Sequence, residues 1–242
     1  MKRLIIAGLL LFLVVLLVTF PARVAYQWLA PAEVKLSGIT GSIWNGKAAE
    51  GIAAGAYVRN IDWTIQPESL FKGQLAFFAS ADPGSGAMTA RIAAKSDGSL
   101  IISDLDGSVP LDLVHQTFQQ SGIRGDVVLE FAKLVIRDGL PVEADGSVTI
   151  NDFFAPVLSA ATIGDFRAVF QTSTDGITGV VNQLSGVINV EGTIDLMADR
   201  SYLFIGQVSP TPETPPSITN QLVFLGSPND LGQRSFRFEG QL

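Results

Sequence analysis

From about Glu33 onward, apolar and polar residues alternate along the chain with a period of two. This period is typical of β-strands that bury one face and expose the other, and it differs from the spacing of an amphipathic helix. The pattern is clearest in residues 57–65, 89–95, 187–196 and 235–242. It predicts a mainly β fold in which antiparallel strands form a twisted or curved sheet or sheets.

Two stretches of the sequence support more detailed predictions about which side chains are buried. In residues 57–65, the face that we expect to be buried collects Tyr57, Ile61, Trp63 and Ile65. Residues 127–136 instead have apolar side chains on both faces. Such a strand is expected to lie centrally in a sheet, or to use its surplus apolar face to line a groove.

A short pattern recurs in which an acidic residue, a glycine and a serine or threonine precede alternating apolar residues. It begins at Asp97, Asp106, Asp145 and Glu191. Asp-Gly readily adopts the positive φ angles of tight hairpin turns, so we interpret the pattern as turns between strands. A calcium-binding loop of the EF-hand type requires a denser array of oxygen ligands than this spacing offers.

Two segments depart from the β pattern and predict short helices. Residues 111–120 follow Pro110 and have apolar residues at helical spacing, and residues 217–226 do the same after Pro216. Residues 152–161 are expected to hold one further short turn. Because no linker is long enough to separate two cores, residues 24–242 are expected to form one β-rich domain with two or three short helices.

The N-terminus carries a different signal. Residues 4–20 are seventeen consecutive residues without a charge, and as a helix they would extend for roughly 26 Å, near the low end of a bilayer core. Lys2 and Arg3 precede this run, so the positive-inside rule places the N-terminus in the cytoplasm and exports the remainder. Residues 1–23 are therefore predicted to be a cytoplasmic tip and a single transmembrane helix, with residues 24–242 in the periplasm.

A cleaved signal peptide is the alternative for this segment. Signal peptides usually have an apolar region of about 7–15 residues followed by a small-residue cleavage site. The run here is longer, and the cleavage sites that follow, such as the one after Ala25, are poor. These features favour an uncleaved anchor.

The composition offers little for catalysis. The chain has no cysteine and one histidine, His115, and the part after Arg23 contains 13 basic and 23 acidic residues. These counts exclude disulfides, thiolate metal sites and a multi-histidine metal site, and they argue against nucleic-acid binding. No nucleophile elbow, phosphate-binding loop or dinucleotide fingerprint occurs. We therefore predict no enzymatic activity, no metal and no cofactor.

The N-terminal third of the domain holds the most distinctive motif. Residues 37–46 read Ser-Gly-x-x-Gly-Ser-x-Trp-Asn-Gly, and a second tryptophan, Trp63, precedes Pro67. Aromatic residues of this kind dominate cores as well as interfaces, and core packing is the more frequent role. The candidate structural or interaction signature comprises Gly41, Trp44, Asn45, Gly46, Trp63 and Pro67.

These residues, together with the apolar leader and the C-terminal blocks Leu184-Ser185-Gly186, Phe224-Leu225-Gly226 and Phe238-Glu239-Gly240, resemble the type II secretion system protein N family of Gram-negative bacteria. The resemblance covers nearly the whole chain. It implies a non-enzymatic accessory component of the inner membrane, with one membrane pass and a periplasmic domain, that supports export of folded proteins together with other secretion subunits. The alternative is a membrane-tethered module similar to the AsmA-like β-groove proteins, with lipid as its partner.

Overall fold

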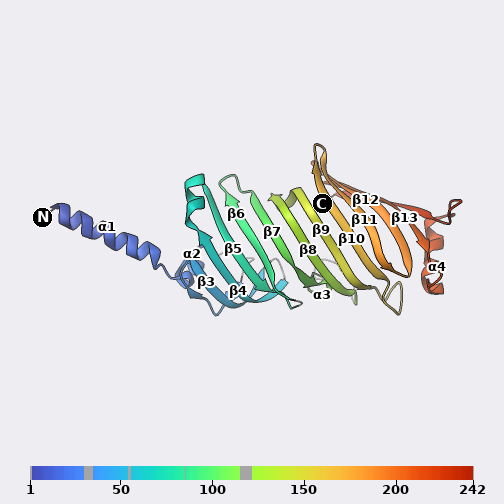
Figure 1. The fold of residues 1–242 in the computed structure, drawn as a ribbon, viewed down its shortest axis with the longest axis horizontal. Coiled ribbons are helices and arrows are strands. Elements are labelled where there is room, and N and C mark those ends of the chain that lie inside the picture. The colour runs from blue at the N-terminus through green and yellow to red at the C-terminus, as the bar shows by residue number, and fades with distance from the viewer. Residues whose placement is uncertain (1, 30–34, 54–55, 85, 115–121, 242) are drawn as a thin grey trace.

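The computed structural model describes residues 2–29, 35–53, 56–84, 86–114 and 122–241 of the chain. Within these residues, fourteen strands form one antiparallel sheet, and the helices are few (Figure 1). The prediction of a mainly β, antiparallel fold is thus confirmed.

The strands follow one another closely along the chain. They are β1 (Lys35–Ser37), β2 (Thr40–Gly41), β3 (Asn45–Ala53), β4 (Ala56–Gln66), β5 (Gln74–Asp82), β6 (Met88–Lys95), β7 (Leu100–Pro110), β8 (Arg124–Arg137), β9 (Leu140–Phe154), β10 (Gly164–Ser173), β11 (Gly176–Gly186), β12 (Ile188–Met197), β13 (Ser201–Pro210) and β14 (Arg234–Gln241). From β3 to β14 each strand pairs with the next one in sequence, while β1 and β2 both pair with β3. Strand β8 lies in the middle of this order, as predicted from the apolar residues on both of its faces.

The helices lie mainly at the two ends of the sheet. They are α1 (Lys2–Val18), α2 (Ala22–Leu29), α3 (Leu111–Val114) and α4 (Pro216–Leu222), with 3₁₀ turns η1 (Pro67–Lys72) and η3 (Val223–Leu225). Helix α1 projects away from the sheet at its N-terminal end, and α4 lies at the opposite end (Figure 1). None of the helices in the described part of the chain is long and apolar enough to cross a membrane.

The expected helices are found in part. The segment predicted at 217–226 forms α4 and η3, and it ends at Gly226 as expected. The helix predicted at 111–120 is present as α3 over its first four residues, while 115–121, with His115, lie outside the described residues. In the segment 152–161 a short turn follows β9, closed by hydrogen bonds from the N–H groups of Leu158 and Ser159 to the Ala155 carbonyl.

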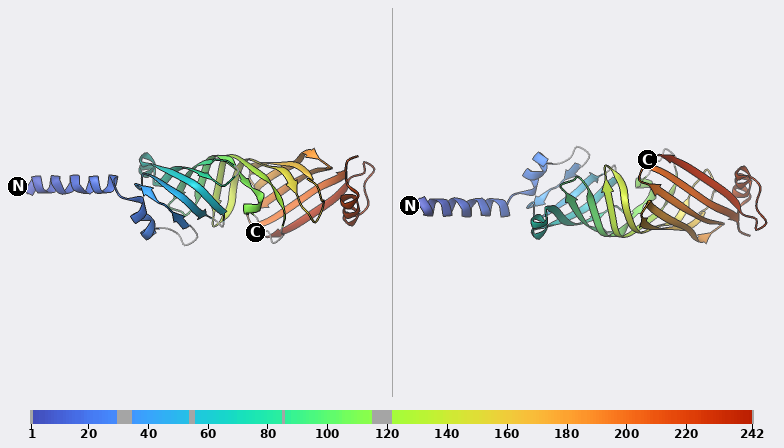
Figure 2. Two further views of the ribbon diagram at one scale, coloured as in Figure 1. Left: turned by 90° about the horizontal axis from the view of Figure 1, so that it is seen from below. Right: turned by 90° about the horizontal axis from the view of Figure 1, so that it is seen from above.

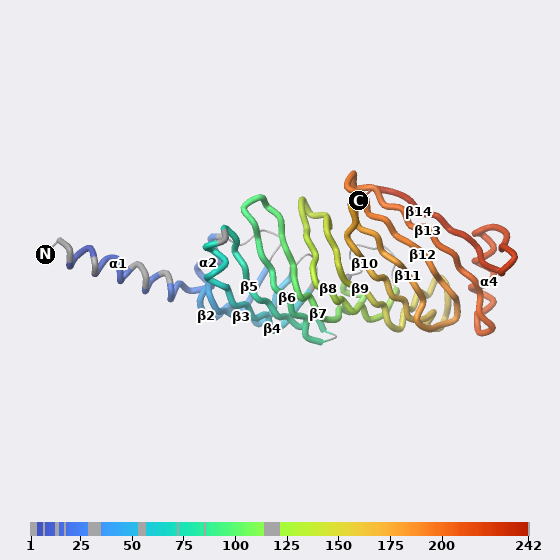
Figure 3. Tube along the Cα trace, turned by 45° about the horizontal axis from the view of Figure 1, so that its top comes forward, coloured from blue at the N-terminus to red at the C-terminus, as the bar shows by residue number. Residues whose placement is uncertain are grey.

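The sheet is curled along its length. Figures 2 and 3 show that the strands near α2 and those near α4 cross the view in different directions, as accumulated twist requires in an open sheet of this size. On one side of the sheet, the rings of Phe131 on β8 and Phe170 on β10 stack with centroids 6.2 Å apart, and both residues pair with Gly146 on the intervening strand β9.

This side of the sheet, here called the apolar face, carries rows of residues that pair directly from strand to strand. One row consists of Leu105, Phe131, Gly146, Phe170, Gly179, Ile194, Phe204 and Phe238. A second row, closer to the N-terminus, consists of Ile65, Phe77, Ile92, Ile102, Leu134 and Ala144. The opposite face, here called the polar face, carries the row Ser108, Val128, Thr149, Arg167, Asn182, Glu191, Gln207 and Ser235.

Aromatic rings cover glycines on the apolar face. In five pairs the aromatic residue lies directly opposite a glycine on the neighbouring strand, and a Cβ built on that glycine would lie 2.3–2.8 Å from a ring atom. The pairs are Trp63 with Gly46, Phe131 with Gly146, Phe170 with Gly179, Phe236 with Gly206, and Tyr202 with Gly240. Each ring thereby shields the backbone of the glycine from water and buries its own surface without a second layer of strands.

This packing corrects the interpretation of the recurring acidic-Gly pattern. Only the copy at Asp97 forms a hairpin turn; those at Asp106, Asp145 and Glu191 lie inside β7, β9 and β12. Gly146, within the second of these strands, lies under the Phe131 ring. Where the pattern lies within a strand, its glycine is therefore required because a side chain at that position would clash with neighbouring atoms, and not because the chain turns there.

The expected burial of residues 57–65 is right for Ile61, Trp63 and Ile65, which are half-buried, and wrong for Tyr57. Tyr57 is exposed, and the adjacent Val58 is buried instead. The pairing of β4 with β5 shifts register between residues 59 and 62, where Asn60 has a φ of 50°. This bulge exchanges the two faces of the strand, which simple alternation cannot anticipate.

Helix α4 closes the C-terminal end of the apolar face. Ile218 and Leu222 of the helix pack in one cluster with Ala155, Ile163 and Val208. Beside the helix lies a cavity of about 370 Å³ whose lining is apolar except for Gln221. The helix thus covers apolar surface that the single sheet cannot bury by itself.

The aromatic–glycine pairs predict the effect of filling the space under a ring. In Gly179→Ala the new methyl group would lie 2.6 Å from Cε1 of Phe170 and 2.7 Å from Cγ2 of Ile194. We expect a destabilisation of about 1–3 kcal/mol, measured by chemical denaturation. Val180→Ala, the control, alters an exposed neighbour and should change stability by about 0.5 kcal/mol or less. An equal loss in both variants would contradict the packing argument.

Two turn carboxylates predict a defined response to acid. Ser99 holds the pKa of Asp97 below its ordinary value through hydrogen bonds from its hydroxyl and its N–H, and Ser201 does the same for Asp199. The stability contributed is therefore present above the ordinary carboxyl pKa and is lost as pH falls through the lowered one. In an NMR titration, Ser99→Ala should raise the Asp97 midpoint and leave that of Asp199 unchanged.

Candidate interaction site at the junction of the N-terminal helices and the sheet

The Gly41–Gly46 segment forms the tight connection between β2 and β3. Gly41 has a φ of 84°, and a Cβ at this position would lie 2.5 Å from the Asn45 carbonyl oxygen. The N–H of Ser42 donates to that carbonyl at 2.9 Å, and the N–H of Asn45 donates to the Ser42 hydroxyl at 3.2 Å. The sequence Gly-Ser-x-Trp-Asn-Gly therefore specifies one closed turn.

Trp63 on β4 holds this turn against the sheet. Its ring lies over Gly46, where a Cβ would be 2.3 Å from Cζ2, and its Nε1–H donates to the Ile43 carbonyl at 3.1 Å. The N–H of Ile65 donates to the Trp44 carbonyl at 2.7 Å. The indole thus combines burial of a large apolar area with a hydrogen bond that fixes the loop.

The same turn binds the segment that leads out of α1. The N–H of Ile43 donates to the Phe20 carbonyl at 3.0 Å, and Pro21 forms an isolated β-bridge with Ser42. Ala22, the first residue of α2, is 4% exposed. Ile43 therefore connects β4 to the segment between α1 and α2. Its carbonyl accepts a hydrogen bond from Trp63, and its N–H donates one to Phe20.

Helix α2 adds a second connection that the sequence analysis did not identify. The hydroxyl of Tyr26 accepts a hydrogen bond from the N–H of Leu36 on β1 at 2.9 Å. The rings of Phe20 and Trp28 lie 6.0 Å apart, and Trp28 is 74% exposed. The available signal was the amphipathic spacing of residues 22–29 directly after a proline, which is a favoured residue next to a helix start.

Five of the six signature residues meet at this junction: Gly41, Trp44, Asn45, Gly46 and Trp63. Pro67 lies two residues beyond Ile65 and begins η1, where its fixed φ suits the first position of a helical turn. Phe20, Pro21 and Tyr26 were not among the candidate site residues, although they complete the junction.

Charges around the junction lie at the surface. Lys47 pairs with Asp62 at 2.6 Å, with both side chains substantially exposed. Glu50 accepts hydrogen bonds from the hydroxyls of Tyr57 and Ser37, and these bonds, that of Tyr57 first, hold the pKa of Glu50 below its ordinary value. These contacts fix β1 against β3 and β4, and they place no nucleophile beside a general base.

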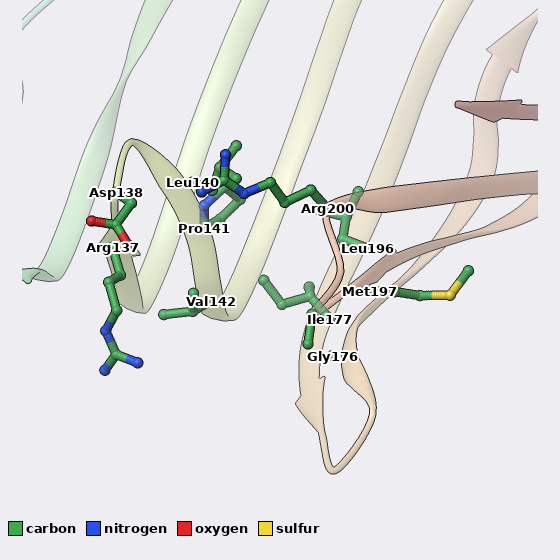
Figure 4. A pocket seen from close by; sticks show the side chains of 11 residues that line it. Arg137, Asp138, Leu140, Pro141, Val142, Gly176, Ile177, Leu196, Met197 and Arg200 are labelled. Carbon is green, nitrogen blue, oxygen red and sulfur yellow. The ribbon is translucent and has the colours of Figure 1, made fainter. Parts of the chain in front are cut away.

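A cavity lies elsewhere in the sheet, away from the junction. About 360 Å³ in volume, it lies at the ends of β8, β9, β11 and β12, where the Arg200 side chain extends toward Leu140 and Pro141 while Arg137 points away (Figure 4). In the part of the chain that the structure describes, no group of three His, Cys, Asp or Glu residues could hold a metal ion. The junction itself joins the N-terminal helices to the first strands of the sheet through hydrogen bonds and packed aromatic rings.

Comparison with known proteins identifies the family to which the chain belongs. The sequence model of the family "Type II secretion system (T2SS), protein N" matches residues 32–237. The chain is 27% identical to type II secretion system protein N of Vibrio cholerae and 24% identical to that of Aeromonas hydrophila, each over 259 aligned residues. These alignments cover 100% of this chain and 99–100% of the relatives.

A further relative, type II secretion system protein N of Aeromonas salmonicida, is 40% identical over 47 residues, which are 19% of this chain and 100% of that sequence. No solved structure matches the chain. The family match covers residues 32–237, which include nearly all of the sheet. By its class, the protein is therefore a subunit of a secretion system. The chain belongs to the type II secretion system protein N family.

The junction predicts how Trp63 contributes to stability. Trp63→Phe keeps a ring over Gly46 but removes the donor to Ile43, so we expect a loss of about 0.5–1.5 kcal/mol. Trp63→Ala also removes the ring and should cost about 3–5 kcal/mol. Both are measured by denaturant unfolding, with Phe71→Ala, at a position that is 95% exposed, as the control with little change. Equal losses for the two Trp63 variants would contradict a separate role for the hydrogen bond.

Proposed function

We propose that this protein is a non-enzymatic accessory or scaffold component of the type II secretion system that supports the export of folded proteins from the periplasm. Family membership over residues 32–237 carries the proposal. The junction adds to it, because its hydrogen bonds attach the N-terminal helices to one end of a long sheet. Such an arrangement suits a subunit that presents a rigid surface to others at a fixed place.

That place, in our proposal, is the inner membrane, with the N-terminus in the cytoplasm and the sheet in the periplasm. Apolar side chains along α1 are exposed, among them Leu4 at 78%, Leu11 at 66% and Val18 at 58%. Such a surface is costly in water and favourable in a bilayer. Lys2 and Arg3 precede the apolar run and favour a cytoplasmic N-terminus.

The test compares two forms of the chain in a strain that lacks the gene. The full chain should restore secretion, whereas a chain that begins at Phe20 behind a cleaved export signal should fold in the periplasm without restoring it. The cut precedes Phe20 because Phe20 and Pro21 contact the turn at residues 42–43. Secretion that is normal without the gene would refute the functional proposal, and full activity of the shortened chain would refute the anchor.

A second candidate function is the binding of lipid acyl chains along the apolar face. The observation that favours it is the row of apolar residues that continues across eight strands, from Leu105 on β7 to Phe238 on β14, with Phe238 56% exposed. The members of this row other than Phe238 are buried or half-buried, so the part of the apolar face that is open to a ligand lies near β14.

Paired photo-reactive positions distinguish this candidate from the first. Phe204 lies on the apolar face of β13, and Ile205, the next residue, lies on the polar face and is 43% exposed. With benzoyl-phenylalanine at each position in cells, lipid binding predicts phospholipid adducts from position 204 and at least tenfold fewer from 205. Equal labelling, or labelling only of proteins, would reject the lipid function.

A further inference from the structure

The two edges of the sheet are unequal. At the N-terminal edge, β1 has three residues, and the N–H of Leu36 that is not used by β3 donates to Tyr26 of α2. At the C-terminal edge, β14 has eight residues and pairs with β13 in an unbroken register from Arg234 to Gln241. In the described part of the chain, no strand pairs with the other side of β14.

Strand β14 carries charged side chains at Arg234, Arg237 and Glu239, but it lacks the backbone features that usually prevent pairing at an edge. It contains no proline, no bulge and no residue with positive φ. In an antiparallel sheet, every second residue of an edge strand directs both its N–H and its C=O away from the neighbouring strand. An eight-residue edge of this kind is a template for another strand.

We propose that β14 receives an extended segment of another protein, which continues the sheet by one strand. The inference rests on the proposed function as a secretion subunit and assigns the surface through which the protein binds a second subunit. Main-chain hydrogen bonds provide the affinity in this mode of recognition, and alternate side chains provide the specificity.

The side chains of β14 specify what the segment must carry. Phe236 and Phe238 lie on the apolar face, so the residues beside them on the incoming strand are apolar. Arg237 and Glu239 lie on the polar face, pair with each other at 2.8 Å and are exposed by 60% and 66%. An acidic residue beside Arg237 and a basic residue beside Glu239 complete the pattern.

A second copy of this chain fits the edge less well. Antiparallel pairing of two β14 strands requires a two-fold axis through the edge, which would reverse one copy relative to the other. Helix α1 leaves the molecule at the end far from β14 (Figure 3), so the two proposed anchors would point in opposite directions. Pairing β14 with β1 of another copy is disfavoured because β1 is short and is held by Tyr26.

The test uses the full chain in cells of the organism that encodes it, with benzoyl-phenylalanine at two edge positions and their direct partners on β13. Arg237 pairs with Ile205 on the polar face, and Phe238 pairs with Phe204 on the apolar face. Positions 237 and 238 should give one protein adduct at least tenfold more abundant than positions 205 and 204. Adducts from positions 236 and 238 should map to residues two apart in a single extended segment.

Proline substitution tests the main-chain pairing itself. Of Arg237→Pro and Phe238→Pro, one removes an N–H that bonds to β13, and the other removes an N–H at the free edge. The variant with the unchanged melting temperature should lose the adduct from position 236 by at least tenfold. If both variants melt early, the swap Arg237→Glu with Glu239→Arg, which keeps the internal ion pair, should lower the adduct at an unchanged melting temperature.

Three results would overturn the inference: edge adducts no stronger than those from β13, an adduct of twice the mass of this chain, or a stable edge variant that keeps the full adduct. Failure of the proposed function is distinguishable from these results. Normal secretion without the gene, combined with a mapped edge adduct that the variants abolish, would leave the binding edge intact and refute only the role in secretion.

Discussion

The fold depends on how a single layer of strands keeps its apolar face away from water. Most domains solve this problem with a second layer of sheet or helices. Here aromatic side chains occupy the space beside glycines on adjacent strands, as Phe131 does at Gly146 and Phe170 does at Gly179. The rings of Phe131 and Phe170 also stack on each other, because both residues flank Gly146 on β9. The glycines make this contact possible because any larger side chain would hold the rings apart.

The sequence sufficed for the features that depend on local periodicity. Alternation identified β4, β6, β12 and β14 with boundaries close to those observed, and the apolar residues on both faces of residues 127–136 indicated the central strand β8. The Pro216 and Gly226 signals bounded the C-terminal helical segment. These features are encoded by neighbours in sequence, which is why a single chain reveals them.

The failures share a different cause. Whether Gly146 makes a turn or a space for Phe131 is decided by a residue on the adjacent strand, fifteen positions away. The exposure of Tyr57 is decided by a bulge at Asn60, which no composition signal marks. For the candidate site, the sequence indicated Trp44 and Trp63, but not that Ile43 joins them to Phe20 through its two backbone groups. Backbone partners of this kind carry no side-chain signature.

The strict sequential order of the strands has a consequence for how the molecule could change in length. Each strand from β3 to β14 contacts chiefly the strands before and after it, so the chain is organised like a ladder of hairpins. In such a quasi-one-dimensional architecture, stability is approximately a sum over neighbouring units. Duplication or loss of one hairpin within the ladder would change the width of the sheet by two strands. The junction at one edge and β14 at the other would keep their own contacts.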